Sequence, residues 1–184
     1  LTDISFQEFG AVLQAIKRGR YRIEKRMVLK ARIGNRTIHA LNDLIVCTRV
    51  PGRSVEFSAV INGEYISRYI ADGIIAATPT GSTAYSLAAG GPILAPELSA
   101  LILTPICPHT LTQRPLVVPD DQDINIILMN DTEGFLTLDG QAALPISRGD
   151  RVQVKQSTNR VLLVQNPKID FFGILRTKLR WGER

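Results

Sequence analysis

Four hydroxyl side chains crowd one short segment of this sequence. The segment reads Thr78-Pro79-Thr80-Gly81-Ser82-Thr83-Ala84-Tyr85, and it lies between an apolar run (residues 73–77) and a helix-compatible run (residues 84–89). This pattern predicts a strand, a polar turn and a short helix. Hydroxyls and free N–H groups at a helix start can bind a nucleobase or a phosphate, and Gly81 allows close approach. The alternative is a simple helix cap, which needs only one hydroxyl.

Two short polar elements suit the same kind of ligand. Asn42 and Asp43 precede a predicted strand, and an amide beside a carboxylate can contact an adenine edge and a ribose diol. Asp72 stands directly before the apolar run that leads into the hydroxyl-rich turn. For each of them the structural alternative is an ordinary turn, and Asp139-Gly140 indicates first of all a β-hairpin. A carboxylate where a strand begins, such as Asp43, is not expected in the core.

The sequence lacks the motifs of the common nucleotide-binding and hydrolytic enzymes. It contains no Gly-x-Gly-x-x-Gly, no phosphate loop of the Gly-x-x-x-x-Gly-Lys-Ser/Thr type and no Gly-x-Ser-x-Gly elbow. Its two cysteines and two histidines do not have the spacing of a zinc site. Cys47 lies in an apolar run and is interpreted as a buried structural thiol. We therefore predict neither a catalytic nor a metal-ligating residue in this chain.

Length and charge narrow the class of protein. The 184 residues are 45% hydrophobic and 21% charged, which suits a globular protein with one large domain or two small ones. We interpret residues 1–184 as a single domain. The net charge of +5 divides into basic ends and an acidic middle, and only 6% of residues are aromatic, so we do not expect nucleic-acid binding. Prolines and glycines interrupt the apolar region 73–114, so no membrane span is predicted. Few cysteines fit a reducing, cytoplasmic location.

The elements expected around these residues are mostly strands. One helix is expected after a Ser5–Glu8 capping box, with Gly19 as its stop. Gly34-Asn35 and Asn62-Gly63 are hairpin turn signals. The predicted strands are 27–33, 44–49, 57–61, 64–69, 123–129, 134–138, 151–155 and 160–165. The fold class is mainly β, with stacked antiparallel sheets, an N-terminal helix and a short helix after the Thr78–Tyr85 turn. The tail 170–181 is expected to dock on another domain or subunit.

Together these motifs resemble the C-terminal domain of NAD kinases. The resemblance rests on Ala40-Leu41-Asn42-Asp43, on Asp72-Gly73, on Thr78–Leu87 with Gly90-Gly91-Pro92, on Pro105–Leu111 and on Asp139-Gly140-Gln141. It implies transfer of a phosphoryl group from ATP, or from polyphosphate, to the adenosine 2′-hydroxyl of NAD, aided by a divalent metal ion such as Mg. In that family an N-terminal α/β domain carries the catalytic aspartate in a Gly-Gly-Asp-Gly motif, which this sequence lacks.

The resemblance also implies roles for individual residues. Asn42 is expected to contact adenine, Asp43 a ribose hydroxyl and Asp72 the nicotinamide carboxamide. The other positions expected at the NAD site are Arg53, Thr80, Thr83, Ala84, Tyr85, Ser86, Leu87, Ala88, Cys107 and Gln141. The segment around Cys107 resembles one that closes the site of a neighbouring subunit. The family resemblance thus implies a homo-oligomer, a dimer or a tetramer.

Two other functions remain open at this point. One is a lipid-kinase-like domain, because diacylglycerol and sphingosine kinases resemble the same two-domain design. The other is a nonenzymatic β domain that only oligomerises. The Asn42-Asp43 pair and the hydroxyl-rich turn favour a nucleotide, and no apolar cleft for a lipid is visible in the sequence.

Overall fold

The computed structural model describes residues 6–48, 54–131, 133–165 and 170–181. Its helical elements are α1 (Phe9–Lys17), the 3-10 turn η1 (Gly81–Thr83), α2 (Tyr85–Ala88) and α3 (Phe171–Leu179). Its strands are β1 (Arg22–Ile33), β2 (Arg36–Ala40), β3 (Asp43–Thr48), β4 (Val55–Ile61), β5 (Glu64–Ala71), β6 (Gly73–Ala77), β7 (Ala100–Ile106), β8 (Leu116–Pro119), β9 (Ile124–Leu128), β10 (Gly134–Leu138), β11 (Ala142–Ile146) and β12 (Arg151–Gln165). Within the described ranges, no helix is long and apolar enough to cross a membrane.

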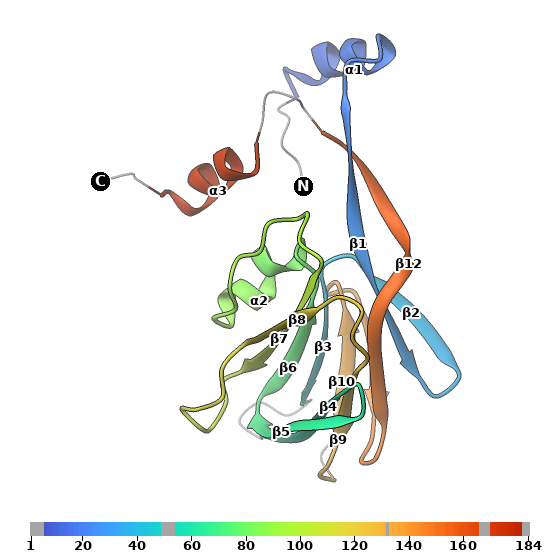
Figure 1. Cartoon of the computed structure of the whole chain (residues 1–184), viewed down its shortest axis with the longest axis vertical. Coiled ribbons are helices and arrows are strands. Elements are labelled where there is room, and N and C mark those ends of the chain that lie inside the picture. The colour runs from blue at the N-terminus through green and yellow to red at the C-terminus, as the bar shows by residue number, and fades with distance from the viewer. Residues whose placement is uncertain (1–5, 49–53, 132, 166–169, 182–184) are drawn as a thin grey trace. The chain divides into compact units, whose positions relative to one another are not determined.

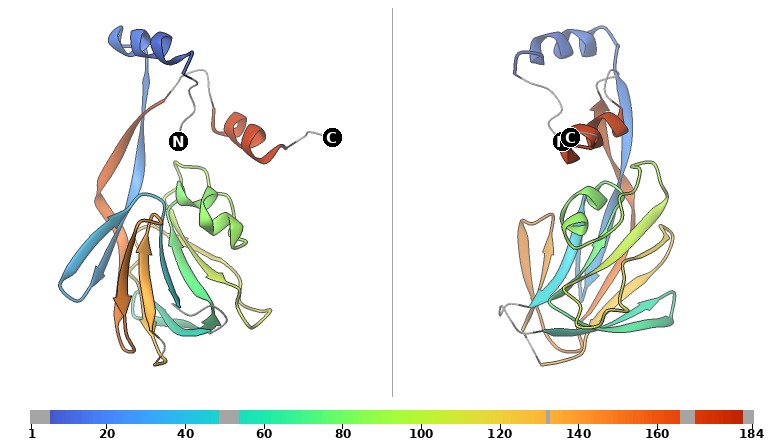
Figure 2. Two further views of the ribbon diagram at one scale, coloured as in Figure 1. Left: turned by 180° about the vertical axis from the view of Figure 1, so that it is seen from behind. Right: turned by 90° about the vertical axis from the view of Figure 1, so that its left-hand side faces the viewer.

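The chain divides into two compact units. One is formed by the two ends, up to Lys25 and from Leu162, and the other by Arg26–Val161. The larger unit holds two sheets, with strand orders β2-β1-β12-β9-β4-β5 and β11-β10-β3-β6-β7-β8 (Figures 1 and 2). All strand pairs with a described register are antiparallel. The predicted fold class of stacked antiparallel sheets is confirmed.

Apolar side chains from both sheets form the main core. Phe57 and Ile126 from the first sheet pack in one cluster with Val46 and Leu136 from the second. A second cluster, which includes Ile45, Ile75 and Ile102, covers the other face of the second sheet. Strands β3 and β6 are therefore buried on both faces, which explains why their sequences are continuous apolar runs without alternation.

The chain passes from one sheet to the other at two corners near the predicted site. Leu41 and Asn42 join β2 to β3, and Asp72 alone joins β5 to β6. Because β3 and β6 are antiparallel neighbours, with Asp43 opposite Ala77 and Cys47 opposite Gly73, the two corners lie at opposite ends of β6. A residue between two ladders has no strand partner for its backbone groups, so other groups must supply the hydrogen bonds.

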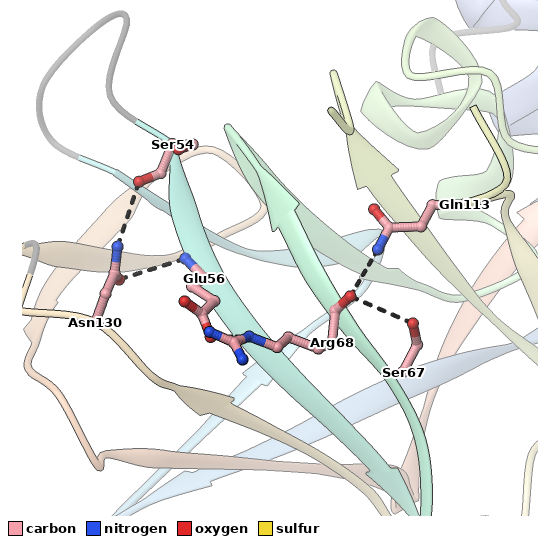
Figure 3. A network of polar contacts seen from close by, with 6 residues as sticks. All are labelled: Ser54, Glu56, Ser67, Arg68, Gln113 and Asn130. Carbon is pink, nitrogen blue, oxygen red and sulfur yellow. Dashed lines mark hydrogen bonds and ion pairs between the residues drawn. The ribbon is translucent and has the colours of Figure 1, made fainter. Parts of the chain in front are cut away.

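Polar contacts fasten the edge strand β5 and its neighbour β4 (Figure 3). The Arg68 guanidinium pairs with the Glu56 carboxylate, and the Gln113 amide donates to the backbone oxygen of Arg68 at 2.7 Å. The Asn130 side chain accepts from the Glu56 N–H and donates to the Ser54 oxygen. Gln113 belongs to the β7–β8 connection of the second sheet. Its hydrogen bond to Arg68 of β5 therefore joins the two sheets along one edge.

Some sequence-based predictions need correction. The two strands expected at 151–155 and 160–165 form the single strand β12, because Ser157 is buried and the polar residues between them continue the strand. The first helix begins at Phe9 after an N-cap at Glu8 that makes no side-chain cap bond, and Ser5 lies outside the described residues. The sequence did not predict α3, whose N-cap Asp170 accepts from the Gly173 N–H. Both hairpin turns were predicted correctly.

Candidate functional site

The β2–β3 corner and the hydroxyl-rich turn lie against each other. The Thr78 N–H donates to the Asn42 oxygen at 2.9 Å, and the Thr78 hydroxyl donates toward the oxygens of Leu41 (2.7 Å) and Asn42 (3.2 Å). Gly81 approaches the corner so closely that an added Cβ would lie 2.0 Å from the Asn42 oxygen. Two predicted site segments, separated by about 40 residues in the sequence, are therefore in direct contact.

A third segment completes this corner from the other side. The Asp139 carboxylate accepts from the N–H groups of Leu41 at 2.8 Å, Asn42 at 2.7 Å and Asp43 at 3.2 Å. The Asp139 N–H in turn donates to the Asp43 oxygen at 3.0 Å. The β10–β11 turn thus supplies the hydrogen bonds that the corner lacks. Its hairpin interpretation is correct, and its carboxylate has this additional role.

The Asp43 side chain is buried, with 4% of its surface exposed, which contradicts the expectation that it lies outside the core. Burial, and then the negative charge of Asp139, raise the pKa of Asp43 from 3.8 to about 6, whereas a hydrogen bond from the Tyr85 N–H acts in the opposite direction. Placing a charge in a poorly hydrated corner causes this rise. The result is a carboxylate close to its titration range at neutral pH.

The hydroxyls of the turn divide into two groups. Thr78, Ser82 and Ser86 are fully buried. The Ser82 hydroxyl donates to the Pro79 oxygen and accepts from the Leu94 N–H, and the Ser86 hydroxyl bonds that of Thr104 at 2.9 Å. Buried hydroxyls must find such partners. Only Thr80, which is half-buried, and Thr83, which is exposed, can offer hydroxyls to a ligand.

The rest of the predicted site near this corner comes from the following helix and hairpin. Tyr85 is 46% exposed and directs its N–H toward Asp43. Ala84 and Leu87 are half-buried, and Ala88 is exposed. Gln141 is exposed beside the Asp139 turn, where its N–H donates to the Leu138 oxygen. These residues belong to the helix that directly follows the hydroxyl-rich turn and to the Asp139 turn. Those two turns are the segments that contact the β2–β3 corner.

Asp72 and Cys107 lie at the other end of the strands. The Asp72 N–H donates to the Ile106 oxygen at 2.9 Å, next to the exposed Cys107. The five residues of β6 separate Asp72 from Thr78, a length of about 17 Å at 3.4 Å per residue. The structure therefore does not bring Asp72 into contact with the Asn42-Asp43 corner. Arg53, the remaining predicted residue, lies outside the described residues.

Sequence reasoning missed two charged residues at this corner. Arg26 in β1 is 9% exposed, and its guanidinium donates to the Thr80 hydroxyl at 3.4 Å. Its position immediately before the apolar run from Met27 is a weak signal for burial. Asp139 stood out as a hairpin turn and as part of the family resemblance, but its long-range contact with the corner, over nearly 100 residues, leaves no local pattern.

Amide, hydroxyl and ionisable carboxyl groups therefore meet at one corner of a β-sandwich. This chemistry suits a binding domain for a polar, hydroxyl-bearing ligand such as a nucleoside.

Comparison with known proteins gives the family. Residues 41–166 match the family described as the ATP-NAD kinase C-terminal domain. NAD kinases from Geotalea daltonii and Geobacter metallireducens are each 42% identical to this chain over its whole length, which covers 67% of theirs. The chain thus belongs to the ATP-NAD kinase family and spans about two thirds of the length of these relatives.

Solved structures agree with this assignment. The crystal structure of yeast NADH kinase complexed with NADH has a TM-score of 0.93 and 28% identity, over 100% of this chain and 57% of that one. The structure of an NAD kinase from Archaeoglobus fulgidus in complex with ATP has a TM-score of 0.80 and 26% identity, over 94% of this chain and 66% of that one. None of these comparisons supports the lipid-kinase alternative.

Proposed function

We propose that this chain is the NAD-binding part of an NAD kinase, which transfers a phosphoryl group from ATP, or from polyphosphate, to the adenosine 2′-hydroxyl of NAD. The observation that carries the proposal is the contact between the Asn42-Asp43 corner and the hydroxyl-rich turn, in a chain of this family. The relatives are named NAD kinase, and the solved structures contain NADH or ATP.

In this proposal each polar side chain of the site contacts a particular part of NAD. The Asn42 amide contacts the adenine edge, and the Asp43 carboxylate accepts a hydrogen bond from an adenosine ribose hydroxyl. Thr80 and Thr83 offer their hydroxyls at the adenine, while Ala84, Tyr85, Leu87 and Ala88 line the pocket. Ser86 acts by holding this segment, because its hydroxyl is already bonded to Thr104. Gln141 contacts the dinucleotide from the adjacent hairpin.

The far end of the strands has a separate role in the proposal. Asp72 accepts from the nicotinamide carboxamide, and the segment around Cys107 completes the site of a neighbouring subunit. Because Asp72 lies a strand length from Asp43, a second copy of the chain would supply one of the two ends. We therefore propose a dimer or tetramer. Light scattering at micromolar concentrations tests it, and a strictly monomeric mass would count against it.

The divalent ion that assists phosphoryl transfer is not assigned to this chain. Among the residues that the structure describes, no group of three or more His, Cys, Asp or Glu side chains is placed to hold a metal ion. We treat the ion as part of the ATP substrate, where it offsets phosphate charge. The cytoplasmic location expected from the cysteine content stays a prediction.

Titration of NAD into the purified chain and its Asp43→Ala variant, followed by calorimetry, tests the proposal. Loss of a hydrogen bond to a charged group weakens binding by about 10- to 150-fold. The matched control is Asp121→Ala, which removes an exposed carboxylate from the β8–β9 turn and should leave NAD affinity unchanged. Equal affinity for NAD in the wild-type chain and the Asp43→Ala variant would contradict the assignment of Asp43.

A further inference from the structure

Two segments, the hydroxyl-rich turn and the β10–β11 turn, hold the β2–β3 corner, and the side chain that makes most of the hydrogen bonds is Asp139. The corner contains the successive N–H groups of Leu41 and Asn42, which join β2 to β3, and of Asp43, the first residue of β3. All three donate to the Asp139 carboxylate, at 2.8, 2.7 and 3.2 Å. Charged acceptors form the stronger class of hydrogen bond. The carboxylate therefore fixes the backbone that carries Asn42 and Asp43.

The turn that contains Asp139 does not itself require a carboxylate. Asp139 has a φ of +48° and Gly140 a φ of +68°, both left-handed, in the three-residue connection of the hairpin in which Leu138 pairs with Ala142. Asn serves the first position of such a turn as well as Asp does, because the turn demands only a tolerated positive φ. The negative charge at Asp139 is therefore available for a role outside the hairpin, and its contacts show where it acts.

We propose that Asp139 is a positioning residue of the NAD site, whose carboxylate holds the Leu41–Asp43 backbone in the conformation that presents Asn42 and Asp43 to the adenosine. This rests on the proposed function. Asp139 does not itself have to touch the ligand, because it acts through the three N–H groups and through its charge.

The electrostatics of the corner supports this role. Burial and the charge of Asp139 raise the pKa of Asp43 to about 6, and the Tyr85 N–H opposes that rise. Arg26 of β1 brings a cation to the hydroxyl-rich turn, where its guanidinium donates to the Thr80 hydroxyl at 3.4 Å. Asp139 thus holds the backbone of Asp43 and, after burial, contributes to the pH at which the Asp43 carboxyl ionises. Because an ionised carboxylate accepts a stronger hydrogen bond from a hydroxyl than a protonated one does, NAD affinity should fall below pH 6.

The variant Asp139→Asn tests the positioning role while leaving the hairpin turn intact. Asn keeps the positive φ, but its amide has one oxygen fewer to accept the corner's N–H groups, and the charge is gone. We expect NAD to bind the 184-residue variant about tenfold more weakly at pH 8, where Asp43 is ionised in both proteins. We also expect the midpoint of the affinity–pH profile to move below that of the wild-type chain, since the repulsion of Asp43 is removed.

The control variant is Asp150→Asn. The Asp150 carboxylate accepts from the Ser147 N–H at 2.8 Å in the turn between β11 and β12, so this change removes the same charge and a comparable bond elsewhere. Affinity and pH midpoint should both stay at their wild-type values. A purely structural role for Asp139 would lower stability in the variant without moving the pH midpoint, and that result would overturn the proposal.

Nuclear magnetic resonance of the ligand-free chain keeps this proposal separate from the proposed function. If the wild-type chain does not bind NAD, the proposed function fails, but Asp139→Asn should still shift the amide signals of Leu41 and Asn42 and lower the pKa of Asp43. Unchanged signals would overturn the positioning role. Should the variant not fold, the wild-type chain decides, because the Leu41 and Asn42 amide protons that donate to the Asp139 carboxylate should exchange slowly with solvent. Rapid exchange of both amide protons would equally overturn the role.

Discussion

At the scale of single residues, two hydroxyls of the hydroxyl-rich turn are buried and stabilise the fold, and two are accessible to solvent. Thr78 and Ser82 are completely buried. The Thr78 hydroxyl is hydrogen-bonded to the backbone of the corner, and the Ser82 hydroxyl to the backbone of Leu94. Thr80 and Thr83 extend from the same turn with hydroxyls that a ligand can reach. A segment with this many hydroxyls is thus explained by two demands together, since buried ones must be paired and exposed ones are left for binding.

Asp43 has an unfavourable charge in the folded protein, and this gives a prediction about stability. Its pKa is 3.8 in a solvated chain and about 6 in the folded one, so between these values the folded state binds more protons. Folding stability therefore decreases as pH rises from 4 to 6. At pH 8 the ionised side chain therefore destabilises the folded state by about 3 kcal/mol, at about 1.4 kcal/mol per pH unit of pKa difference, and this pKa already includes the hydrogen bond from the Tyr85 N–H.

The variant Asp43→Asn should accordingly be more stable than the wild-type chain at pH 8, by about 1–3 kcal/mol. Urea unfolding at pH 8, 6 and 4 measures this, and the advantage should shrink toward pH 4 as the wild-type carboxyl takes up its proton. Asp121→Asn, with an exposed side chain, is the control and should show no such trend. A variant that is less stable than wild type at pH 8 would refute this account.

At the scale of elements, the site depends on a tight contact between a turn and a sheet corner. Gly81 begins η1, and an added Cβ there would meet the oxygen, the carbonyl carbon and the Cα of Asn42 at 2.0, 2.4 and 2.8 Å. These are backbone atoms that cannot rotate away. The contact is therefore possible only for glycine.

Gly81→Ala should destabilise the protein by about 3 kcal/mol and weaken NAD binding at the same time, because the corner must move. Thermal unfolding and calorimetry measure the two effects. Gly10→Ala is the control, since a Cβ at Gly10 in α1 meets nothing within 4 Å, and it should raise helix stability by about 0.5–1 kcal/mol. A Gly81→Ala variant with wild-type NAD affinity would show that the corner and the turn do not act together.

The elements also show which information is local in the sequence. The Asn62-Gly63 hairpin and the run 73–77 were predictable, because turn residues and buried strands have short-range patterns. The continuous β12 was not, because Ser157 is polar in sequence and buried only through its neighbours. The meeting of the Asn42-Asp43 pair with the hydroxyl-rich turn was inferred from a common ligand. Asp139 could not be added to it, because only the fold brings that hairpin to the corner.

At the scale of the whole molecule, the proposed NAD-binding corner does not by itself account for phosphoryl transfer. Such a transfer needs groups that hold the donor phosphates and a group that takes the proton of the attacking hydroxyl. The sequence has no Gly-Gly-Asp-Gly motif, the place where the family resemblance puts the catalytic aspartate. The chain also covers about two thirds of its relatives' length. Binding and catalysis should thus be separable in this protein.

The purified 184-residue chain, mixed with NAD, ATP and Mg²⁺, should therefore form no NADP at a useful rate. A coupled assay that is specific for NADP measures this, and calorimetry on the same sample must show NAD binding, so that a lack of turnover does not reflect misfolded protein. Asp43 is already engaged by the Tyr85 N–H and is proposed to hold a ribose hydroxyl, so it is not expected to replace the missing base. Robust ATP-dependent formation of NADP would contradict this. It would make Asp43, whose pKa of about 6 suits proton transfer near neutral pH, the first base to test by Asp43→Asn.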